Sequence, residues 1–253
     1  MKTIVFDSLS KWIAFRKKFR RGKIGFVPTM GALHQGHVSL VERSRFENPI
    51  TVVSIFVNPT QFNDPNDLKN YPRTFKGDYE LLKAAGADFL IYPKYDEIYA
   101  DGYKFRVSEN HLSGILCGAS RPGHFEGVLT VVMKLFNLVG PTRAYFGEKD
   151  YQQFLLIKEM VDSFFMNIQV VPCPIIREEN GLAMSSRNER LSAEGREKAG
   201  LFFKELSSGK ELKEIRKNLE ENGFKVDYIE EFFGRRLGAV FLENVRLIDN
   251  VPA

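Results

Sequence analysis

The chain has 253 residues, of which 43% are hydrophobic and 27% are charged. That length is enough for one large domain or two modest ones, and it is ample for a hydrophobic core. The formal net charge of +4 says little about partners. No apolar run approaches the ~20 residues that a membrane span requires. The composition therefore argues against a membrane partner.

Two sequence features bear on the compartment. Cys117 and Cys173 share no motif spacing, and so few cysteines in a chain of this length are typical of a reducing compartment. The segment that starts at Met1 meets Asp7 too early to form the apolar part of a secretory signal. We therefore expect a cytoplasmic protein.

The first predicted helix begins after Ser8, ends at Gly22 and carries the densest basic run, residues 16–23. The apolar residues of this helix that can face the interior are Leu9, Trp12, Ile13 and Phe19. A solvated helix face explains the basic run better than a nucleic-acid patch, because no other nucleic-acid signature is present.

Farther along the chain, apolar strand-like runs alternate with helical patterns. The predicted strands are residues 25–27, 51–57, 88–92, 144–146 and 168–171. The predicted helices are residues 38–46, 75–85, 126–139 and 151–165. This alternation predicts an α/β fold with a doubly wound, Rossmann-like parallel sheet. In such sheets ligands bind beyond the carboxyl ends of the strands, at a point where the strand order reverses.

The character of the sequence changes near residue 176, where a charged, turn-forming segment follows. We place a domain boundary there, with a Rossmann-like domain at 1–175 and a smaller α+β domain at 176–253. The predicted elements of the second domain are helices at 193–206 and 211–222 and short strands at 226–229 and 245–248. A unit of this size buries little surface by itself, so we expect it to act as a lid on the sheet.

The turn that follows residues 23–27 carries the strongest chemical pattern. Pro28 and the glycines at 31 and 36 predict a turn, and a helical pattern follows it. The first N–H groups of a helix lack partners and attract anions. Two imidazoles, His34 and His37, can donate to phosphate oxygens. The segment therefore predicts a phosphate-binding turn.

Three other interpretations fit this turn less well. Residues 31–36 have the G-x-x-x-x-G frame of a P-loop, but His37 and Val38 stand where the P-loop needs lysine and a hydroxyl. His34 and His37 could bind a metal, yet no Glu or Cys accompanies them in a known metal-binding spacing. A purely structural turn stays open, because Gly and Pro mark turns in every fold.

Other predicted strand-end turns carry polar side chains as well. Lys149 offers an ammonium to phosphates, and Asp150 could cap the following helix. Residues 184–187 offer two hydroxyls and a guanidinium. Gln61 and Gln153 are amides, which suit a ligand that combines hydroxyls with a carboxylate.

Residues 28–37, Pro-Thr-Met-Gly-Ala-Leu-His-Gln-Gly-His, resemble the signature of the pantothenate synthetase (pantoate–β-alanine ligase) family. Within them, H-x-G-H resembles the element of the HIGH nucleotidyltransferase superfamily. Residues 184–187 resemble the K-M-S-K-S loop of the same superfamily, with Arg187 as the final cation. The other segments that carry the family resemblance are residues 53–62, 121–127, 146–153, 184–188 and 246–250.

This resemblance implies an enzyme, an adenylate-forming ligase that condenses pantoate with β-alanine at the expense of ATP. It implies catalytic roles for His37, His34 and Lys149, with His37 as general acid. It implies contacts of Gln61 with pantoate and β-alanine, and of Gln153 with pantoate. The ATP-binding residues that it implies are Met30, Gly31, Ala32, Leu33, His34, Gln35, Gly36, His37, Gly147, Glu148, Lys149, Asp150, Ile176, Met184, Ser185, Ser186 and Arg187.

The resemblance further implies Mg²⁺ that arrives with the triphosphate rather than in a protein cage, a homodimer, and no nucleic-acid partner. Two alternatives share parts of the pattern: a nucleotidyltransferase acting on a phosphorylated small molecule, and a nucleotide-binding module without turnover. The segment 228–246 looks shorter than the family usually has, with little room for an extra strand. In that case Phe232, Phe233 and Phe241 could compensate by closing the smaller domain onto the first domain or onto a partner subunit.

Overall fold

The computed structural model describes residues 2–18 and 22–253, so the predicted inward-facing Phe19 lies outside the described residues. The chain forms two compact units. The first consists of Met1–Leu33, His37–Gly147 and Gln152–Cys173; the second consists of His34–Gly36, Glu148–Tyr151 and Pro174–Ala253. The domain boundary at residue 175 stays a prediction. Two short segments that include the first residues of helices thus belong to the second unit, although their neighbours in sequence belong to the first.

The first unit is built on a six-stranded sheet in the order β1-β4-β3-β2-β5-β6. Its strands are β1 (Ile4–Phe6), β2 (Ile24–Thr29), β3 (Ile50–Ile55), β4 (Phe89–Ile91), β5 (Arg143–Gly147) and β6 (Gln169–Cys173). All neighbouring strands are parallel. From β2 the chain builds one side of the sheet, and with β5 it begins the other. The predicted doubly wound parallel sheet is confirmed, although the short β1 was not predicted.

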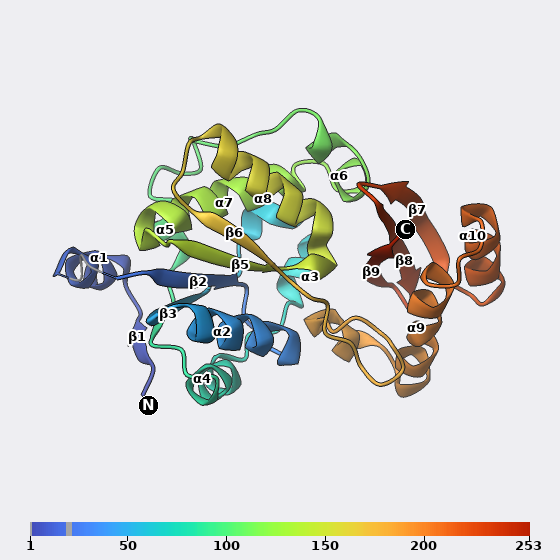
Figure 1. The fold of residues 1–253 in the computed structure, drawn as a ribbon, viewed down its shortest axis with the longest axis horizontal. Coiled ribbons are helices and arrows are strands. Elements are labelled where there is room, and N and C mark those ends of the chain that lie inside the picture. The colour runs from blue at the N-terminus through green and yellow to red at the C-terminus, as the bar shows by residue number, and fades with distance from the viewer. Residues whose placement is uncertain (1, 19–21) are drawn as a thin grey trace. The chain divides into compact units, whose positions relative to one another are not determined.

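Helices cover both faces of this sheet, with α2 and α4 on one face and α7 and α8 on the other (Figure 1). The helices of this part of the chain are α1 (Leu9–Lys18), α2 (Gln35–Glu47), α3 (Pro65–Lys69), α4 (Phe75–Ala84), α5 (Tyr95–Ile98), α6 (Cys117–Ser120), α7 (His124–Val139) and α8 (Tyr151–Ser163). The first unit also has two short 3-10 turns, η1 (Pro59–Gln61) and η2 (Leu112–Gly114), whereas η3 (Glu148–Asp150) belongs to the second unit.

The core explains why the central strands read as apolar runs. Val52 and Val53 on β3 are fully buried, as are Phe26 and Val27 on β2. Successive residues on a strand point to opposite faces, so a strand with helices on both sides buries them all. Burying each such side chain stabilises the fold by about 1.5–3 kcal/mol, because its apolar surface is removed from water.

Pro28 does not end the second strand, contrary to the prediction from its sequence. β2 continues through Pro28 to Thr29, in register with Ser54 and Ile55 of β3. On its other side β2 pairs with β5 only at Gly25 and Phe26. Because that ladder ends before residue 28, proline can stand in a central strand where it need not donate a backbone hydrogen bond.

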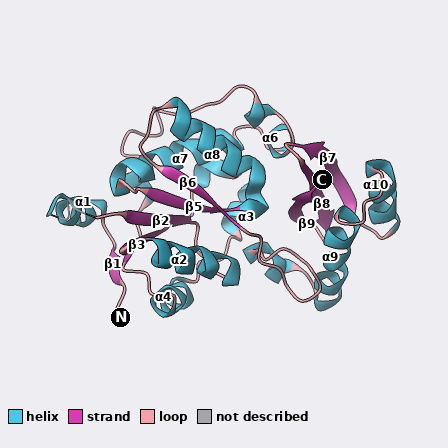
Figure 2. Ribbon diagram, viewed as in Figure 1, coloured by secondary structure: helices cyan, strands magenta, loops and turns pink. Residues whose placement is uncertain are grey.

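The second unit has a three-stranded antiparallel sheet with two helices packed on it (Figure 2). Its elements are the 3-10 turn η4 (Ser186–Arg190), α9 (Ala193–Leu206), α10 (Leu212–Glu221), β7 (Lys225–Phe232), β8 (Arg235–Leu242) and β9 (Val245–Pro252). Its buried core includes Phe202, Leu206 and Ile215 from the helices and Val240 and Leu247 from the sheet.

The expectation that residues 228–246 leave little room for another strand is wrong, because β8 fills this segment. Two two-residue loops make room for it, Phe233–Gly234 and Glu243–Asn244. All four loop residues have positive φ, as the tightest hairpin turns require. Gly234 and Asn244 are typical of that conformation, but Phe233 and Glu243 are not, so both hairpins escaped prediction.

Candidate active site

The turn after β2 is held by a buried carboxylate. Gly31 and Ala32 both have positive φ, which is unusual for alanine. Asp78, on the first turn of α4 and 2% exposed, accepts hydrogen bonds from the N–H groups of Ala32 (3.0 Å) and Leu33 (2.8 Å). The hydroxyl of Thr74 donates to the same carboxylate at 3.0 Å. Asp78 thus fixes the backbone of the predicted phosphate turn.

The residues around the start of α2 form a helix cap that is separate from the turn held by Asp78. The backbone N–H of Gly36 donates to Nδ1 of His34 at 3.1 Å, so the imidazole caps the helix that Gln35 begins. A Cβ on Gly36 would lie 2.9 Å from the His34 ring. Glycine at position 36 is therefore explained by the close approach of the His34 ring and not by the conformation of the turn. His37 follows on the first turn of the same helix.

The protonation of His34 follows from its surroundings in the second unit. Burial, together with the ammonium of Lys149, lowers the pKa of His34 from 6.5 to about 4, although the carboxylates of Asp150 and Glu178 oppose the change. The imidazole is therefore neutral near pH 7. Since Nδ1 accepts from Gly36, its proton is on Nε2, and the ring can donate a hydrogen bond from that atom.

Glu178 is the negative group of this cluster that the sequence analysis did not single out. Its carboxylate accepts from the amide of Asn188 at 2.7 Å and from Nε of Arg196 at 2.6 Å. Burial alone would raise the pKa of Glu178, but these two hydrogen bonds bring it below its usual range. A carboxylate occupied in this way orients its neighbours and stays ionised.

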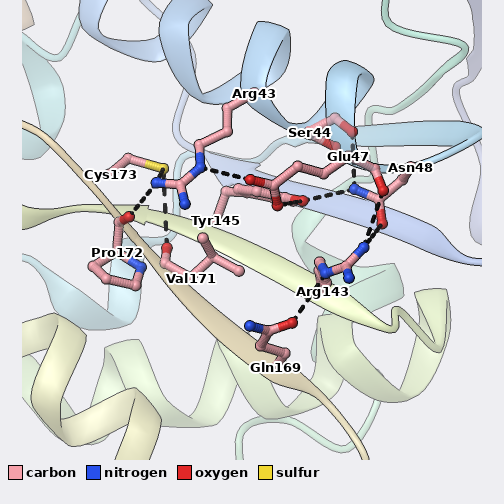
Figure 3. A network of polar contacts seen from close by, with 10 residues as sticks. All are labelled: Arg43, Ser44, Glu47, Asn48, Arg143, Tyr145, Gln169, Val171, Pro172 and Cys173. Atoms are coloured by element: carbon pink, nitrogen blue, oxygen red, sulfur yellow. Dashed lines mark hydrogen bonds and ion pairs between the residues drawn. The ribbon is translucent and has the colours of Figure 1, made fainter.

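A polar network fixes the later turns of α2 to the sheet (Figure 3). Arg43 donates to the carbonyl of Pro172 on β6 at 2.6 Å and to Glu47 at 2.9 Å. The hydroxyl of Tyr145, on β5, donates to Glu47 at 2.8 Å. Burial and the neighbouring Glu47 raise the pKa of Tyr145 to about 12, which keeps its proton in place. The helix that carries His37 is therefore anchored to two strands.

Gln61 is oriented by partners from three segments of the first unit, around residues 30, 58 and 121–124. Its Oε1 accepts from the amide of Asn58 at 3.0 Å, and its Nε2 donates to the sulfur of Met30 at 3.1 Å. The backbone carbonyl of Gln61 contacts Nδ1 of His124 at 2.8 Å and accepts from Arg121 at 3.2 Å. The structure thus brings the predicted residues Gln61 and Met30 together. It also gives the 121–127 segment a role that its sequence did not reveal.

Two adjacent glutamines on α8 differ sharply. The amide of Gln152 is buried and fully engaged, accepting from the N–H of Cys117 and donating to the carbonyls of Leu112 and Ile115. Gln153 is half-buried, and its amide has no hydrogen-bond partner among the described residues. This difference favours Gln153 as the amide available to a ligand, as its motif predicts.

The strand-to-helix turn after β5 is divided between the units. Gly147 ends β5 in the first unit, and a Cβ there would meet no described atom within 4 Å. The chain's own packing therefore does not require glycine at this position. Glu148, Lys149 and Asp150 form η3 in the second unit, with 3.7 Å between Nζ of Lys149 and Oδ2 of Asp150.

The segment around residues 176–187 is held by its own backbone hydrogen bonds. Arg177 and Ala183 form an antiparallel bridge, and the N–H of Met184 donates to the carbonyl of Ile176 at 2.9 Å. Two predicted ATP-binding residues, Ile176 and Met184, are thereby side by side. Ser185 caps η4 by accepting from the N–H of Arg187. The hydroxyl of Ser185, one of the two in the predicted ATP-binding segment, therefore stabilises the backbone at Arg187.

Each unit therefore assembles part of the predicted site. Met30 and Gln61 are in contact in the first unit, and His34 and Lys149 interact in the second. Sequence reasoning missed the residues that bind the backbone of these segments or act on their side chains, which are Asn58, Asp78, His124, Glu178 and Asn250. Asn58, His124 and Asn250 lie in segments that carry the family resemblance, which was the available signal.

Neither a metal centre nor a membrane span is found in the part of the chain that the structure describes. No group of three or more His, Cys, Asp or Glu side chains within residues 2–18 and 22–253 is arranged to hold a metal ion. Over the same residues, none of the helices combines the length and the apolar character needed to cross a bilayer.

The fold and site define an α/β protein whose candidate ligand residues follow the carboxyl ends of parallel strands. β2 and β5 are neighbours at the point where the strand order reverses, and the predicted phosphate turns follow these two strands. The family model of pantoate–β-alanine ligase matches residues 4–252. The chain belongs to this family.

Close relatives match over nearly their whole length. Pantothenate synthetase of Legionella pneumophila (strain Lens) is 55% identical over 247 residues, covering 97% of this chain and 98% of that protein. Pantothenate synthetase of Bdellovibrio bacteriovorus is 53% identical over 249 residues, covering 98% of this chain and 99% of that protein. Whether the second unit is shorter than the family's usual one stays a prediction, but it is not shortened relative to these proteins.

Solved structures agree with the fold. The pantoate–β-alanine ligase of Francisella tularensis, complexed with β-γ ATP and β-alanine, superposes with a TM-score of 0.94 at 41% identity, covering 99% of this chain and 97% of that one. Pantothenate synthetase of Thermus thermophilus gives a TM-score of 0.90 at 41% identity, covering 99% of both chains.

Proposed function

We propose that this chain condenses pantoate with β-alanine, using ATP, to form pantothenate, AMP and pyrophosphate. The observation that carries the proposal is the family match over residues 4–252. The structure of the Francisella relative, complexed with β-γ ATP and β-alanine, supports two of the three substrates. The site geometry supports ATP, since two strand-to-helix turns with donor side chains follow neighbouring parallel strands.

The reaction proceeds in two steps. A pantoate carboxylate oxygen attacks the α-phosphorus of ATP, the bond to the bridging oxygen breaks, and pyrophosphate leaves. The β-alanine amine then attacks the carbonyl of pantoyl adenylate, the bond to the AMP oxygen breaks, and the amine loses a proton. Negative charge develops on phosphate oxygens in the first step, so fixed donors aimed at those oxygens accelerate it most.

The residues of this chain divide these tasks. Lys149 contributes a charge, His37 stands at the positive end of α2 and donates as general acid, and neutral His34 donates from Nε2. Because the pKa of His34 is far below neutrality, it stabilises charge without giving up its proton. Gln61 and Gln153 bind pantoate through their amides, and Gln61 also contacts β-alanine.

The remaining expectations belong to the same proposal. Mg²⁺ would be carried in with the triphosphate and would neutralise part of its charge, without a cage of protein carboxylates of its own. The protein acts on small molecules, as a homodimer, in the cytoplasm.

An exchange experiment tests the proposal. With pantoate present and β-alanine absent, labelled pyrophosphate should enter ATP, because adenylation precedes attack by the amine. His37→Ala should slow this exchange by about 100- to 10,000-fold, the usual cost of one donor to a developing charge. An exchange that needs β-alanine, or that proceeds without pantoate, would overturn the two-step reaction.

A further inference from the structure

Asn250, in the segment 246–250, reaches the predicted phosphate turn from the last strand. It lies on β9 and is 1% exposed. Its Nδ2 donates to the backbone carbonyl of Glu148 at 2.9 Å and to that of Lys149 at 3.1 Å. Both amide hydrogens are thereby used on two consecutive peptide groups of η3, and all of these residues belong to the second unit.

The orientation of this amide is fixed. Its Oδ1 accepts from Nε of Arg235 on β8. A guanidinium only donates, so the amide cannot turn over without losing this hydrogen bond and facing its oxygen toward two carbonyls. The Cζ of Arg235 lies 4.7 Å from the ring centre of Tyr151, and its Nη1 lies 3.9 Å from Oε1 of Glu148. The same arginine therefore contacts both ends of the turn.

The backbone of Asn250 is held just as firmly. Asp249 is 4% exposed and accepts from both terminal nitrogens of Arg177, at 2.6 and 2.9 Å, and from the N–H of Asn250 at 2.7 Å. The guanidinium of Arg177 lies 3.7 Å from the ring centre of Phe203. Burial raises the pKa of Asp249, and Arg177 opposes that change. These contacts fix the backbone of the strand next to Asn250.

We infer that Asn250 is the positioning residue of Lys149, setting where the lysine ammonium meets the phosphates of ATP. Two hydrogen bonds to carbonyls on either side of the Lys149 Cα fix the backbone from which that side chain extends. A misplacement of about 1 Å at a reacting group can cost about 100-fold in rate. The inference rests on the proposed role of Lys149.

The sharpest variant is Asn250→Asp, which keeps the shape of the side chain and its acceptor for Arg235. It replaces two donors with an oxygen that faces two carbonyls. We expect pantoate-dependent pyrophosphate exchange to fall about 10- to 100-fold, with pantoate KM changed less than about threefold. Should Asn250→Asp not fold, Asn250→Ser keeps one donor, adds no charge and should lose about 3- to 10-fold.

A double-mutant cycle with Lys149→Ala separates positioning from general loss of structure. If Asn250 acts through Lys149, Asn250→Asp should cost less than about threefold in the Lys149→Ala background. The control is Asn218→Ala, which removes a hydrogen bond from α10 to Glu205 on α9 in the same unit. It should lower the melting temperature and leave exchange unchanged.

Equal losses from Asn250→Asp in both backgrounds would overturn the inference, as would a normal rate in the single variant. If Lys149→Ala itself exchanged at the normal rate, the proposed role of Lys149 would fail and the inference with it. A slow Lys149→Ala enzyme beside a normal Asn250→Asp enzyme would leave the proposed function standing and reject only the positioning role.

Discussion

At the scale of single residues, His34 illustrates how the fold chooses a protonation state. An imidazole in water is half-protonated near pH 6.5. Burial and the charge of Lys149 bring the pKa of His34 to about 4, and the N–H of Gly36 occupies Nδ1. The ring is then a neutral donor with a defined tautomer over the whole physiological range. The H-x-G-H pattern names the residue but not this state.

The pKa of His34 predicts a pH effect on stability. The unfolded chain binds a proton at this histidine below pH 6.5, whereas the folded protein does so only near pH 4. Stability should therefore fall as the pH drops from 6.5 to 4, by at most about 3 kcal/mol. Urea unfolding of the protein and of His34→Gln across this range measures the effect. A difference between the two that does not change with pH would contradict it.

At the scale of elements, the turn after β2 depends on helix α4. Asp78 supplies the acceptors for two backbone N–H groups that the left-handed residues Gly31 and Ala32 leave without a strand partner. The predicted ATP-binding residues 30–33 are therefore shaped by a carboxylate more than forty positions later in the chain. A short motif can thus supply the residues that contact a ligand, while a helix distant in sequence fixes the backbone conformation of that motif.

Asp78→Asn should weaken both folding and adenylation. One oxygen of the carboxylate becomes an NH₂ group, so one buried N–H loses its acceptor, at a cost of about 1–3 kcal/mol. We expect exchange to slow about 10- to 100-fold because the phosphate turn shifts. Urea unfolding and pyrophosphate exchange measure the two effects.

The control for Asp78→Asn is Glu80→Gln, on the same helix, which breaks only an exposed ion pair with Lys83. It should change stability by less than about 1 kcal/mol and leave exchange intact. Equal behaviour of the two variants would show that the buried carboxylate does not shape the turn.

At the scale of the whole molecule, the second unit is more complete than its sequence suggested. A shortened unit that lacked a strand would protect the reactive adenylate poorly, and AMP would escape. The unit instead has three full strands, and the chain spans 98% of the length of its Legionella relative. Phe232 and Phe233 stay exposed at the end of β7, edge to face at 4.2 Å between ring centres. Their part in closing the site stays a prediction.

We therefore expect no unusual loss of the intermediate. With ATP and pantoate but no β-alanine, AMP release should be within about threefold of that of the Legionella relative under matched conditions, because closed sites limit such side reactions. Quenched time courses of labelled ATP measure it. A clearly faster release would revive the idea of a thinner second unit.

The sequence by itself determined the class of fold and the identity of the chemical groups. Apolar runs alternating with helical patterns report burial directly, so the covered strand β3 was predicted, and the glycines and histidines of segment 28–37 predicted the turn between β2 and α2. Such signals are local, because side-chain burial and turn conformation depend on neighbours in the chain. β8 escaped because its hairpin loops use Phe and Glu where positive φ usually calls for glycine or asparagine.

Only the tertiary structure decided how those groups are held. Asp78 reaches Leu33 across 45 positions, His124 reaches Gln61 across 63, and Asn250 reaches Lys149 across 101. Gln152 is buried and hydrogen-bonded whereas Gln153 is half-buried, and this difference depends on which face of α8 is buried. Hydrogen bonds and desolvation act over a few ångströms in space, whatever the distance along the chain, and no local pattern records them.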